Sequence, residues 1–220
     1  MNIREKTYQS RGYWIEENLR YKHVYFRTVK IAHIINRLSR GKQCDLLDIG
    51  CGPETLSTLL EPNINYFGID IAIHSPKQNL IELDIVHNPI EFREKSFDFV
   101  VAAGLFEYLG DQYEKKYSEI QRLLKPGGKF IVTYMNMKHC TKPYFPTWNY
   151  ITSIERFKAD LRKYFHVYHS FPSYYSNQPG DLTGSMIRKL QLHLNVNIPL
   201  LADKYGVNYI YITGPKKVTP

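Results

Sequence analysis

An apolar run leads directly into a closely spaced pair of glycines at residues 46–54, which read Leu46-Leu47-Asp48-Ile49-Gly50-Cys51-Gly52-Pro53-Glu54. Glycine lets the backbone approach a ligand closely, because it has no Cβ atom. A helix that starts just after such a turn offers unpaired N–H groups to an anionic group. The segment therefore predicts a strand, a ligand-binding turn and a helix over 54–60, and it limits the fold to sheets that bind ligands at their carboxyl edge.

Short apolar runs then alternate with helical patterns, which is typical of a parallel sheet with crossover helices. The predicted strands are 45–49, 66–70, 80–84, 97–102, 129–134, 166–171 and 208–213. The predicted helices are 13–39, ended by Gly41, then 54–60, 113–124 and 154–164, with a helix-containing excursion at about 176–203. The last two strands lack a full-length helix immediately between them, which indicates an antiparallel edge. We predict an α/β, Rossmann-like, seven-stranded, mostly parallel sheet with an antiparallel edge strand and helices on both faces.

One crossover is short. Only residues 71–79, which include Pro76, separate the second and third predicted strands. A parallel crossover takes about a dozen residues or more, usually with a helix. We therefore expect no full helix over 71–79, and we expect the amino-terminal helical segment to pack nearby.

Acidic residues stand at the ends of three successive predicted strands. Asp48 ends the first, Asp70 follows it by 22 residues, and Asp84 ends the third. An acid at the end of the second strand is the ribose-diol acceptor of a nucleotide-binding βαβ unit. Asp48 is placed to accept a hydrogen bond from an ammonium group. Asp84 is placed to accept one from an adenine amino group, and the neighbouring Ile85 amide is a donor. One such acid alone is more often an exposed loop residue, but three in this order after the glycine turn favour a ligand site.

These motifs resemble the class I S-adenosylmethionine (SAM)-dependent methyltransferase superfamily, in particular small-molecule methyltransferases of type 11. The resemblance runs from about residue 44 to 135 and includes the segments 48–52, 68–70, 96–101 and 123–128. It implies SAM as the cofactor and the transfer of its methyl group to an O or N atom of a small organic acceptor. The cofactor-binding residues that it implies are Asp48, Gly50, Cys51, Gly52, Asp70, Ile71, Asp84, Ile85 and Ala102.

Departures from the pattern affect the acceptor side. Relatives often carry a histidine where this chain has Tyr108, so we interpret Tyr108 as an orienting hydroxyl. His139 is the preferred general base, although a solvent-exposed loop histidine is the alternative. The residues predicted to contact the acceptor are Tyr13, Trp14, Tyr134 and Asn136. Core packing is the alternative for the amino-terminal aromatics, and the aromatic segments 144–150 and 171–175 are expected to line the same pocket.

The resemblance implies a single domain over 1–220, with a basic helical cap (1–42), a cofactor-binding core (43–135) and substrate-side loops with the final strand (136–220). The net charge is +8, and residues 1–42 hold ten Lys/Arg against three Asp/Glu. Such a segment favours an acidic small-molecule acceptor, or it is a solvated helix face. No apolar run reaches the roughly 18–20 residues that span a bilayer, and residues 1–6 lack a signal-peptide pattern, so we expect a cytoplasmic protein.

The three cysteines, Cys44, Cys51 and Cys140, have no CxxC spacing. The sequence therefore predicts neither a disulfide framework nor a metal site, and Cys44 and Cys51 are expected to be buried apolar thiols.

Three other functions are alternatives for this sequence. A nicotinamide-dependent oxidoreductase uses a similar turn, but it favours a small or apolar residue where this chain has Asp48. An RNA methyltransferase fits the basic charge, yet residues 102–105 lack the Asn/Asp-Pro-Pro-aromatic segment of exocyclic amine methylation, and no RNA-binding module is evident. A non-catalytic subunit that binds a partner through residues 176–203 has no physical need for three aligned acids.

Overall fold

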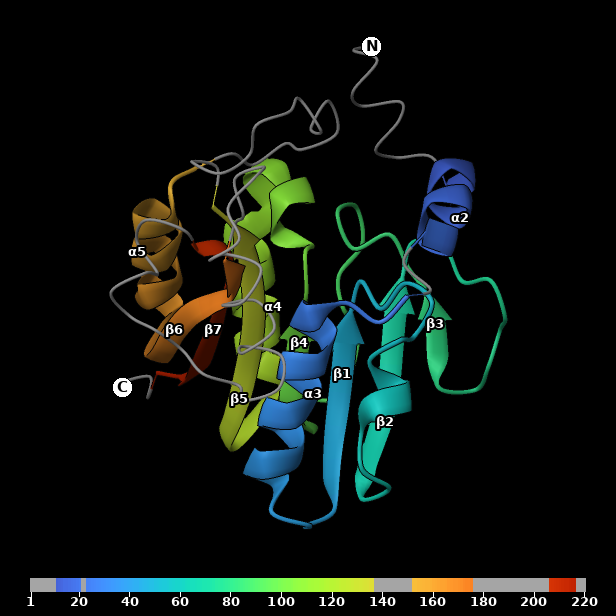
Figure 1. Ribbon diagram of the computed structural model, residues 1–220, viewed down its shortest axis with the longest axis horizontal. Helices are drawn as coiled ribbons and strands as arrows, with labels where there is room; N and C mark the ends of the chain where they lie inside the picture. Colours follow the sequence, from blue (N-terminus) through green and yellow to red (C-terminus); the bar gives the residue numbers. More distant parts are fainter. Residues whose placement is uncertain (1–10, 21–22, 137–151, 176–205, 217–220) are drawn as a thin grey trace, which may run out of the picture.

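The computed structural model describes residues 11–20, 23–136, 152–175 and 206–216 (Figure 1). Seven strands form one sheet in the order β3-β2-β1-β4-β5-β7-β6. Their bounds are β1 Cys44–Ile49, β2 Ile64–Asp70, β3 Leu80–Glu82, β4 Phe97–Ala102, β5 Leu124–Met135, β6 Phe165–Tyr175 and β7 Gly206–Pro215. The five neighbouring strands β3, β2, β1, β4 and β5 pair in parallel. Strand β7 runs antiparallel to both β5 and β6. The predicted mostly parallel sheet with an antiparallel edge is confirmed.

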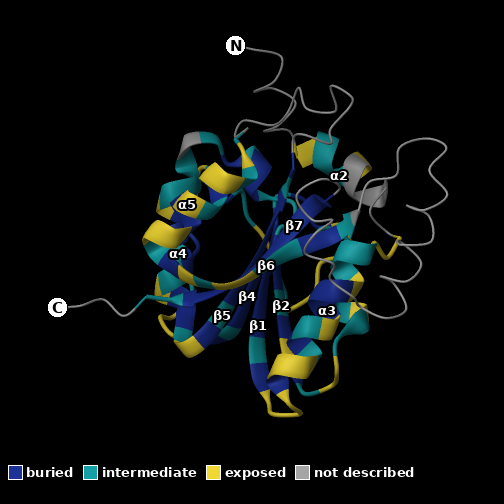
Figure 2. Ribbon diagram, turned by 60° about the vertical axis from the view of Figure 1, so that its left-hand side comes forward, coloured by how far each residue is buried: buried dark blue, intermediate teal, exposed yellow. Residues whose placement is uncertain are grey.

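Helices cover both faces of this sheet, as predicted (Figure 2). Helix α3 (Phe26–Ser39) buries Ile31 and Ile35 against Leu46 on one face. Helices α4 (Tyr113–Leu123) and α5 (Ile154–Tyr164) cover the other face, with Ile120 and Phe157 in the cluster of buried residues there. Because apolar helices cover both faces, β1 and β4 consist almost entirely of buried residues.

The helix predicted over 13–39 is in fact two helices, α2 (Arg11–Arg20) and α3. A single straight helix of this length would extend for roughly 40 Å, about twice the length of a six-residue strand. Tyr25, at the start of α3, is extended, with φ −88° and ψ 154°. The break lets α2 lie near β3, where Arg11 pairs with Glu82 at 2.6 Å, while α3 packs on the sheet.

The predicted end of the helical segment at Gly41 is confirmed. Arg40 caps α3 in the left-handed conformation with φ 51°, and Gly41 follows with φ 71°. Two left-handed residues in succession cannot continue an α-helix.

The crossover between β2 and β3 contains no helix, as predicted. Instead, the Gly68 amide donates to the Asn79 carbonyl, and the Asn79 side chain donates to the Tyr66 carbonyl. These bonds bring residue 79 back beside β2 without a covering helix. The third strand is shorter than predicted and ends at Glu82.

The helix predicted over 54–60 is wrong, because only one 3₁₀ turn, η1 (Ser57–Leu59), forms there. Glu54 has φ 58°, which an α-helix does not permit. The hydroxyl groups of Ser57 and Thr58 donate to the carbonyls of Glu54 and Thr55. Such local bonds offer the backbone an alternative to a continuing helix.

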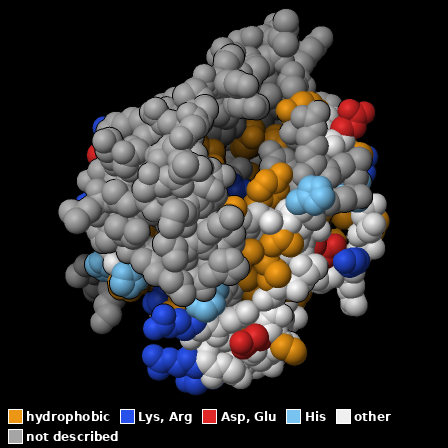
Figure 3. Space-filling model, in the orientation of Figure 1, with side chains coloured by type: hydrophobic (Ala, Val, Ile, Leu, Met, Phe, Trp, Pro, Cys, Tyr) orange, Lys and Arg blue, Asp and Glu red, His pale blue; other side chains and the backbone are white. Residues whose placement is uncertain are grey.

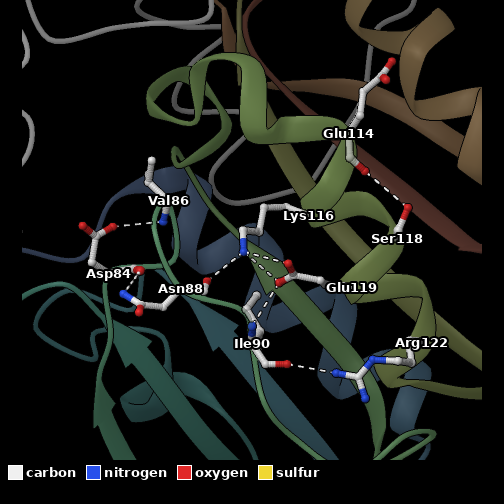
Figure 4. A network of polar contacts seen from close by, with 9 residues as sticks. All are labelled: Asp84, Val86, Asn88, Ile90, Glu114, Lys116, Ser118, Glu119 and Arg122. Carbon is white, nitrogen blue, oxygen red and sulfur yellow. Dashed lines mark hydrogen bonds and ion pairs between the residues drawn. The ribbon is translucent and has the colours of Figure 1, made fainter.

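A buried ion pair fastens the segment after β3 to helix α4 (Figure 4). Lys116 is 1% exposed, donates to both carboxylate oxygens of Glu119, and donates to the Asn88 carbonyl at 2.9 Å. The Glu119 carboxylate also accepts from the Ile90 amide, and Arg122 donates to the Ile90 carbonyl, both at 3.0 Å. Residues 84–90, which begin with Asp84, are therefore held by α4.

Replacing Lys116 by Met should lower the free energy of unfolding by about 1–3 kcal/mol, because it leaves the partly buried Glu119 carboxylate without its cation. Chemical denaturation measures the loss. Lys115→Met, at an exposed position of the same helix, is the matched control and should change stability by less than about 0.5 kcal/mol. Equal losses in the two variants would contradict a specific role for the buried pair.

Candidate functional site

The turn after β1 is fixed by backbone hydrogen bonds to β2. The amides of Gly50 and Cys51 donate to the Ile69 carbonyl at 2.8 and 3.1 Å. Gly50 has φ 75°, and a Cβ atom there would lie 3.2 Å from the Leu105 side chain. Glycine at this position thus satisfies both the left-handed conformation and the close approach of Leu105.

Asp48 is a buried carboxyl at the end of β1. The Tyr66 hydroxyl donates to its Oδ2 atom at 2.9 Å. Burial, with a smaller contribution from the nearby Asp70 carboxylate, raises the pKa of Asp48 to about 7, although the Tyr66 hydrogen bond and the Arg27 charge act in the opposite direction. A cationic group placed beside Asp48 would favour its ionised form.

Backbone amides hold both Asp70 and Asp84. The Asp70 carboxylate accepts from the amides of Gly52 and Ala72 at 2.8 and 3.0 Å. Asp84 accepts from the Val86 amide at 2.9 Å, and its Oδ2 atom lies 2.7 Å from His87 Nδ1. Both carboxylates are therefore oriented without any ligand.

A cavity of about 410 Å³ opens over the carboxyl ends of β1, β2 and β4. Figure 3 shows this face hollowed beside α2, with hydrophobic side chains around the hollow. Ten residues predicted for the site line it, namely Asp48, Gly50, Cys51, Gly52, Asp70, Ile71, Asp84, Ile85, Trp14 and Tyr108. The structure thus brings together predicted residues that lie far apart in the sequence.

Cys44 and Cys51 are buried free thiols, as predicted. Burial raises the pKa of the Cys51 thiol far above neutrality, with neighbouring carboxylates adding to the shift. A thiol of this kind stays protonated and does not act as a nucleophile.

Two predicted residues lie in the core and do not line the cavity. Tyr134 is fully buried, stacks on Phe157 with ring centroids 4.2 Å apart, and accepts from the Thr152 amide through its hydroxyl oxygen. Successive side chains of a strand point to opposite faces, so Tyr134 faces α5 while the next residue, Met135, reaches the cavity. Ala102 is also fully buried, and its neighbour Ala103 lines the cavity instead.

The remaining predicted residues are placed as follows. The Asn136 side chain donates to the Gly206 carbonyl at 2.8 Å and connects β5 to β7. The Tyr13 ring lies edge-on to Trp14, with centroids 5.2 Å apart, and is not part of the cavity lining. His139, the aromatic segment 144–150, Cys140 and the excursion 176–203 lie outside the described residues.

Tyr174 lines the cavity, as expected for the segment 171–175, but the sequence reasoning missed other lining residues, among them Arg27, Glu107, Met135 and Asn208. They come from elements far apart in the chain, so no local spacing connects them. Only Glu107 carries a signal, because it is a charged residue inside the apolar segment 105–109.

Arg27 is the one residue with a permanent positive charge among the described residues of the lining. A Cβ atom on Gly104 would lie 2.5 Å from its Nη1 atom, so the guanidinium rests directly on the Gly104 backbone. Its charge lowers the pKa values of Asp48 and Glu107, although burial has the larger, opposite effect on each. Its buried Nε atom has no hydrogen-bond partner in the described part of the chain.

Comparison with known proteins gives a consistent result. Residues 47–132 match the family model described as "Methyltransferase domain". An uncharacterized protein of Methanocaldococcus jannaschii is 27% identical over 72% of this chain and 73% of its own length. The cyclopropane-fatty-acyl-phospholipid synthase of Escherichia coli is 26% identical over 50% of this chain, but over only 31% of its own length.

Two solved structures share the fold. The 1,6-didemethyltoxoflavin-N1-methyltransferase of Burkholderia thailandensis, with bound S-adenosylhomocysteine, has a TM-score of 0.61 at 16% identity and covers 96% of this chain and 89% of its own. A TehB-like SAM-dependent methyltransferase of Corynebacterium glutamicum has a TM-score of 0.60 at 14% identity and covers 94% and 100%. The family match, the glycine turn and this fold agree with the class I SAM-dependent methyltransferases, and the match of residues 47–132 to a methyltransferase domain indicates S-adenosylmethionine as the cofactor.

Proposed function

We propose that this chain transfers the methyl group of SAM to an O or N atom of a small organic acceptor, and that both bind in the 410 Å³ cavity. The observation that carries the proposal is the meeting of Asp48, Asp70 and Asp84 with the glycine turn on one cavity wall. SAM supplies a methyl group already activated on a sulfonium, so the protein's main contribution is alignment.

In this proposal, the three acidic residues of the wall each bind a different part of SAM. Asp48 receives the ammonium of the methionine part, Asp70 the ribose hydroxyls, and Asp84 with the Ile85 amide the adenine. Arg27, with its unpartnered Nε atom, offers a cation to the methionine carboxylate. The wall therefore has a donor or acceptor of suitable charge for each polar part of the cofactor.

A small organic acceptor also agrees with the names of relatives. One is called phosphoethanolamine N-methyltransferase and another sterol 4-C-methyltransferase, both from Caenorhabditis elegans and both matched over about half of this chain. The expected acidic acceptor finds no support in the cavity, because the described lining holds the carboxyls of Asp48, Asp70, Asp84 and Glu107 against Arg27 alone. None of the described helices is long and apolar enough to cross a membrane.

Asp48→Ala and Asp70→Ala should each weaken binding of S-adenosylhomocysteine roughly 10- to 150-fold, since each removes a hydrogen bond to a charged group worth about 1.5–3 kcal/mol. Isothermal titration calorimetry gives the affinities. Asp45→Ala is the matched control, because Asp45 lies at the opposite end of β1 and pairs with Lys125. Unchanged affinity in both site variants would refute the assignment of the cofactor wall.

The affinity for S-adenosylhomocysteine should rise with pH between 6 and 8. The pKa of Asp48 is about 7 in the free protein, so the carboxyl is mostly neutral below that pH and ionised above it. Only the ionised form attracts an ammonium group, so affinity at pH 6 should be roughly tenfold below its plateau. Calorimetry over this range measures the profile, and Asp48→Asn should flatten it. A wild-type profile as flat as that of Asp48→Asn would contradict the role of Asp48.

The acceptor class is tested with SAM that carries a labelled methyl group, incubated separately with a metabolite extract and with total RNA. Label should enter small organic compounds, and transfer should depend only weakly on salt. An RNA footprint of several phosphates would instead lose orders of magnitude in affinity between about 50 and 200 mM salt. Label mainly in RNA with such a steep dependence would overturn the acceptor class, and no transfer at all would favour a non-catalytic subunit.

A further inference from the structure

The cavity has a second polar end, away from the glycine turn. It is formed where β5 ends, where β7 begins, and by the 3₁₀ turn η2 (Phe106–Tyr108) after β4. Its lining residues are Trp14, Glu107, Tyr108, Met135, Tyr174 and Asn208, and we call this set the acceptor end. None of them belongs to the wall assigned above to the cofactor.

Glu107 is held rigidly at the acceptor end with half of its carboxyl unused. The side chain is 1% exposed, and Oε1 accepts from the Met135 amide at 2.9 Å. Its Oε2 atom is buried and has no hydrogen-bond partner among the described residues. A buried carboxyl oxygen without a partner is costly, so a group that donates to it would be bound favourably.

Asn208 presents a second unused acceptor beside it. Asn208 pairs in register with Met135 of β5 and with Tyr174 of β6, and it is 2% exposed. Its Oδ1 atom also lacks a hydrogen-bond partner in the described part of the chain. Glu107 is bonded to the backbone of Met135 and Asn208 lies opposite Met135 in the β5–β7 pair, so the same end of β5 positions both side chains.

Arg27 does not neutralise Glu107 by direct contact. No ion pair joins them among the described residues, because the Arg27 guanidinium rests on the Gly104 backbone, near Asp48. In the proposed function, Arg27 receives the carboxylate of the cofactor. The acceptor end therefore keeps two hydrogen-bond acceptors and has no free cation of its own in the described lining.

The rest of the acceptor end is largely apolar and aromatic. Trp14 of α2 lies edge-on to Tyr108 with ring centroids 5.1 Å apart, and both line the cavity. Aromatic walls with a few fixed polar atoms are typical of sites for small organic ligands.

We propose that Glu107 Oε2 and Asn208 Oδ1 select the methyl acceptor by binding an amine or hydroxyl group attached to an apolar or aromatic body, and that they exclude carboxylates. This inference rests on the proposed function, since it identifies which acceptors the same cavity takes. An amine can donate to both oxygens and a hydroxyl to one of them, whereas a carboxylate would place like charge against Glu107 in a water-poor site. Burial raises the pKa of Glu107, and a cationic donor would reverse that effect.

The test uses three probes of similar shape, benzylamine, benzyl alcohol and benzoate, added to protein saturated with S-adenosylhomocysteine and followed by ligand-observed NMR. Benzylamine and benzyl alcohol should bind at least tenfold more tightly than benzoate. Glu107→Gln should weaken benzylamine at least tenfold, and Asn208→Leu should weaken it severalfold. Glu91→Gln, at an exposed site, is the matched control and should change nothing.

Affinity for S-adenosylhomocysteine is measured in every variant, and it should stay within about twofold of the wild type because Glu107 and Asn208 lie outside the cofactor wall. If the wild-type protein binds no S-adenosylhomocysteine, the proposed function fails, and this inference with it. If it does bind, three results overturn the inference alone. They are benzoate binding as tightly as benzylamine, equal benzylamine binding by wild type and Glu107→Gln, and no binding of either donor probe.

Discussion

Two backbone hydrogen bonds at the end of β2 hold the turn after β1, on which the Asp48 and Asp70 part of the cofactor wall depends. The amides of Gly50 and Cys51 both donate to the Ile69 carbonyl, so the turn after β1 cannot move independently of β2. The next residue, Asp70, then reaches back to the Gly52 amide. These three hydrogen bonds between the turn and the end of β2 set the separation between the carboxyls of Asp48 and Asp70. It also explains how the turn keeps its position although the helix expected after it is reduced to one 3₁₀ turn.

Buried charge is distributed unevenly along the cavity. Arg27 affects the carboxyls of Asp48 and Glu107 on either side of it, yet it forms a close ion pair with neither in the described structure. A direct pair would satisfy both partners and leave little reason to bind a ligand. Separated charges instead leave room for ligand groups of the opposite sign. In the proposed function, the zwitterionic methionine part of SAM binds beside Asp48 and Arg27, and the hydrogen-bond donor of the acceptor binds beside Glu107.

The parts of the fold and site that the sequence predicts are those that depend on local chemistry. The glycine turn, the acids near strand ends and the helix-free crossover at 71–79 each follow from a few neighbouring residues. The structure shows all three, although β3 ends at Glu82, two residues before Asp84. The helix expected over 54–60 failed because Glu54 takes a left-handed conformation that the hydrophobic pattern does not encode. The single helix expected over 13–39 is wrong for a similar reason, because the length of the strands on which it packs is not encoded in the local hydrophobic pattern.

The acceptor end illustrates the opposite situation. Glu107 and Asn208 are about a hundred residues apart, and only the pairing of β5 with β7 brings them to either side of Met135. Tyr134 was assigned to the site on its place after the fifth strand, but the alternation of side chains along β5 turns it toward α5. One residue of register separates a core position from a cavity position, and register depends on pairing with distant strands.

Polar groups at the amino ends of the strands have hydrogen-bond partners within the protein, whereas some of those at the carboxyl ends have none among the described residues. At the amino edge, Lys125 pairs with Asp45 and Asp98 at 2.8 and 2.7 Å, and the Asp45 amide donates to Asp98 as well. Lys125 and Asn65 hold the pKa of Asp45 below its usual value, although partial burial opposes them. At the carboxyl edge, the buried Asp48 and Glu107 have raised pKa values, and Glu107 keeps one oxygen without a described partner. Acids at the amino ends of the strands thus stabilise the sheet. An acid beyond the carboxyl ends, Glu107, keeps an oxygen with which it can bind a ligand.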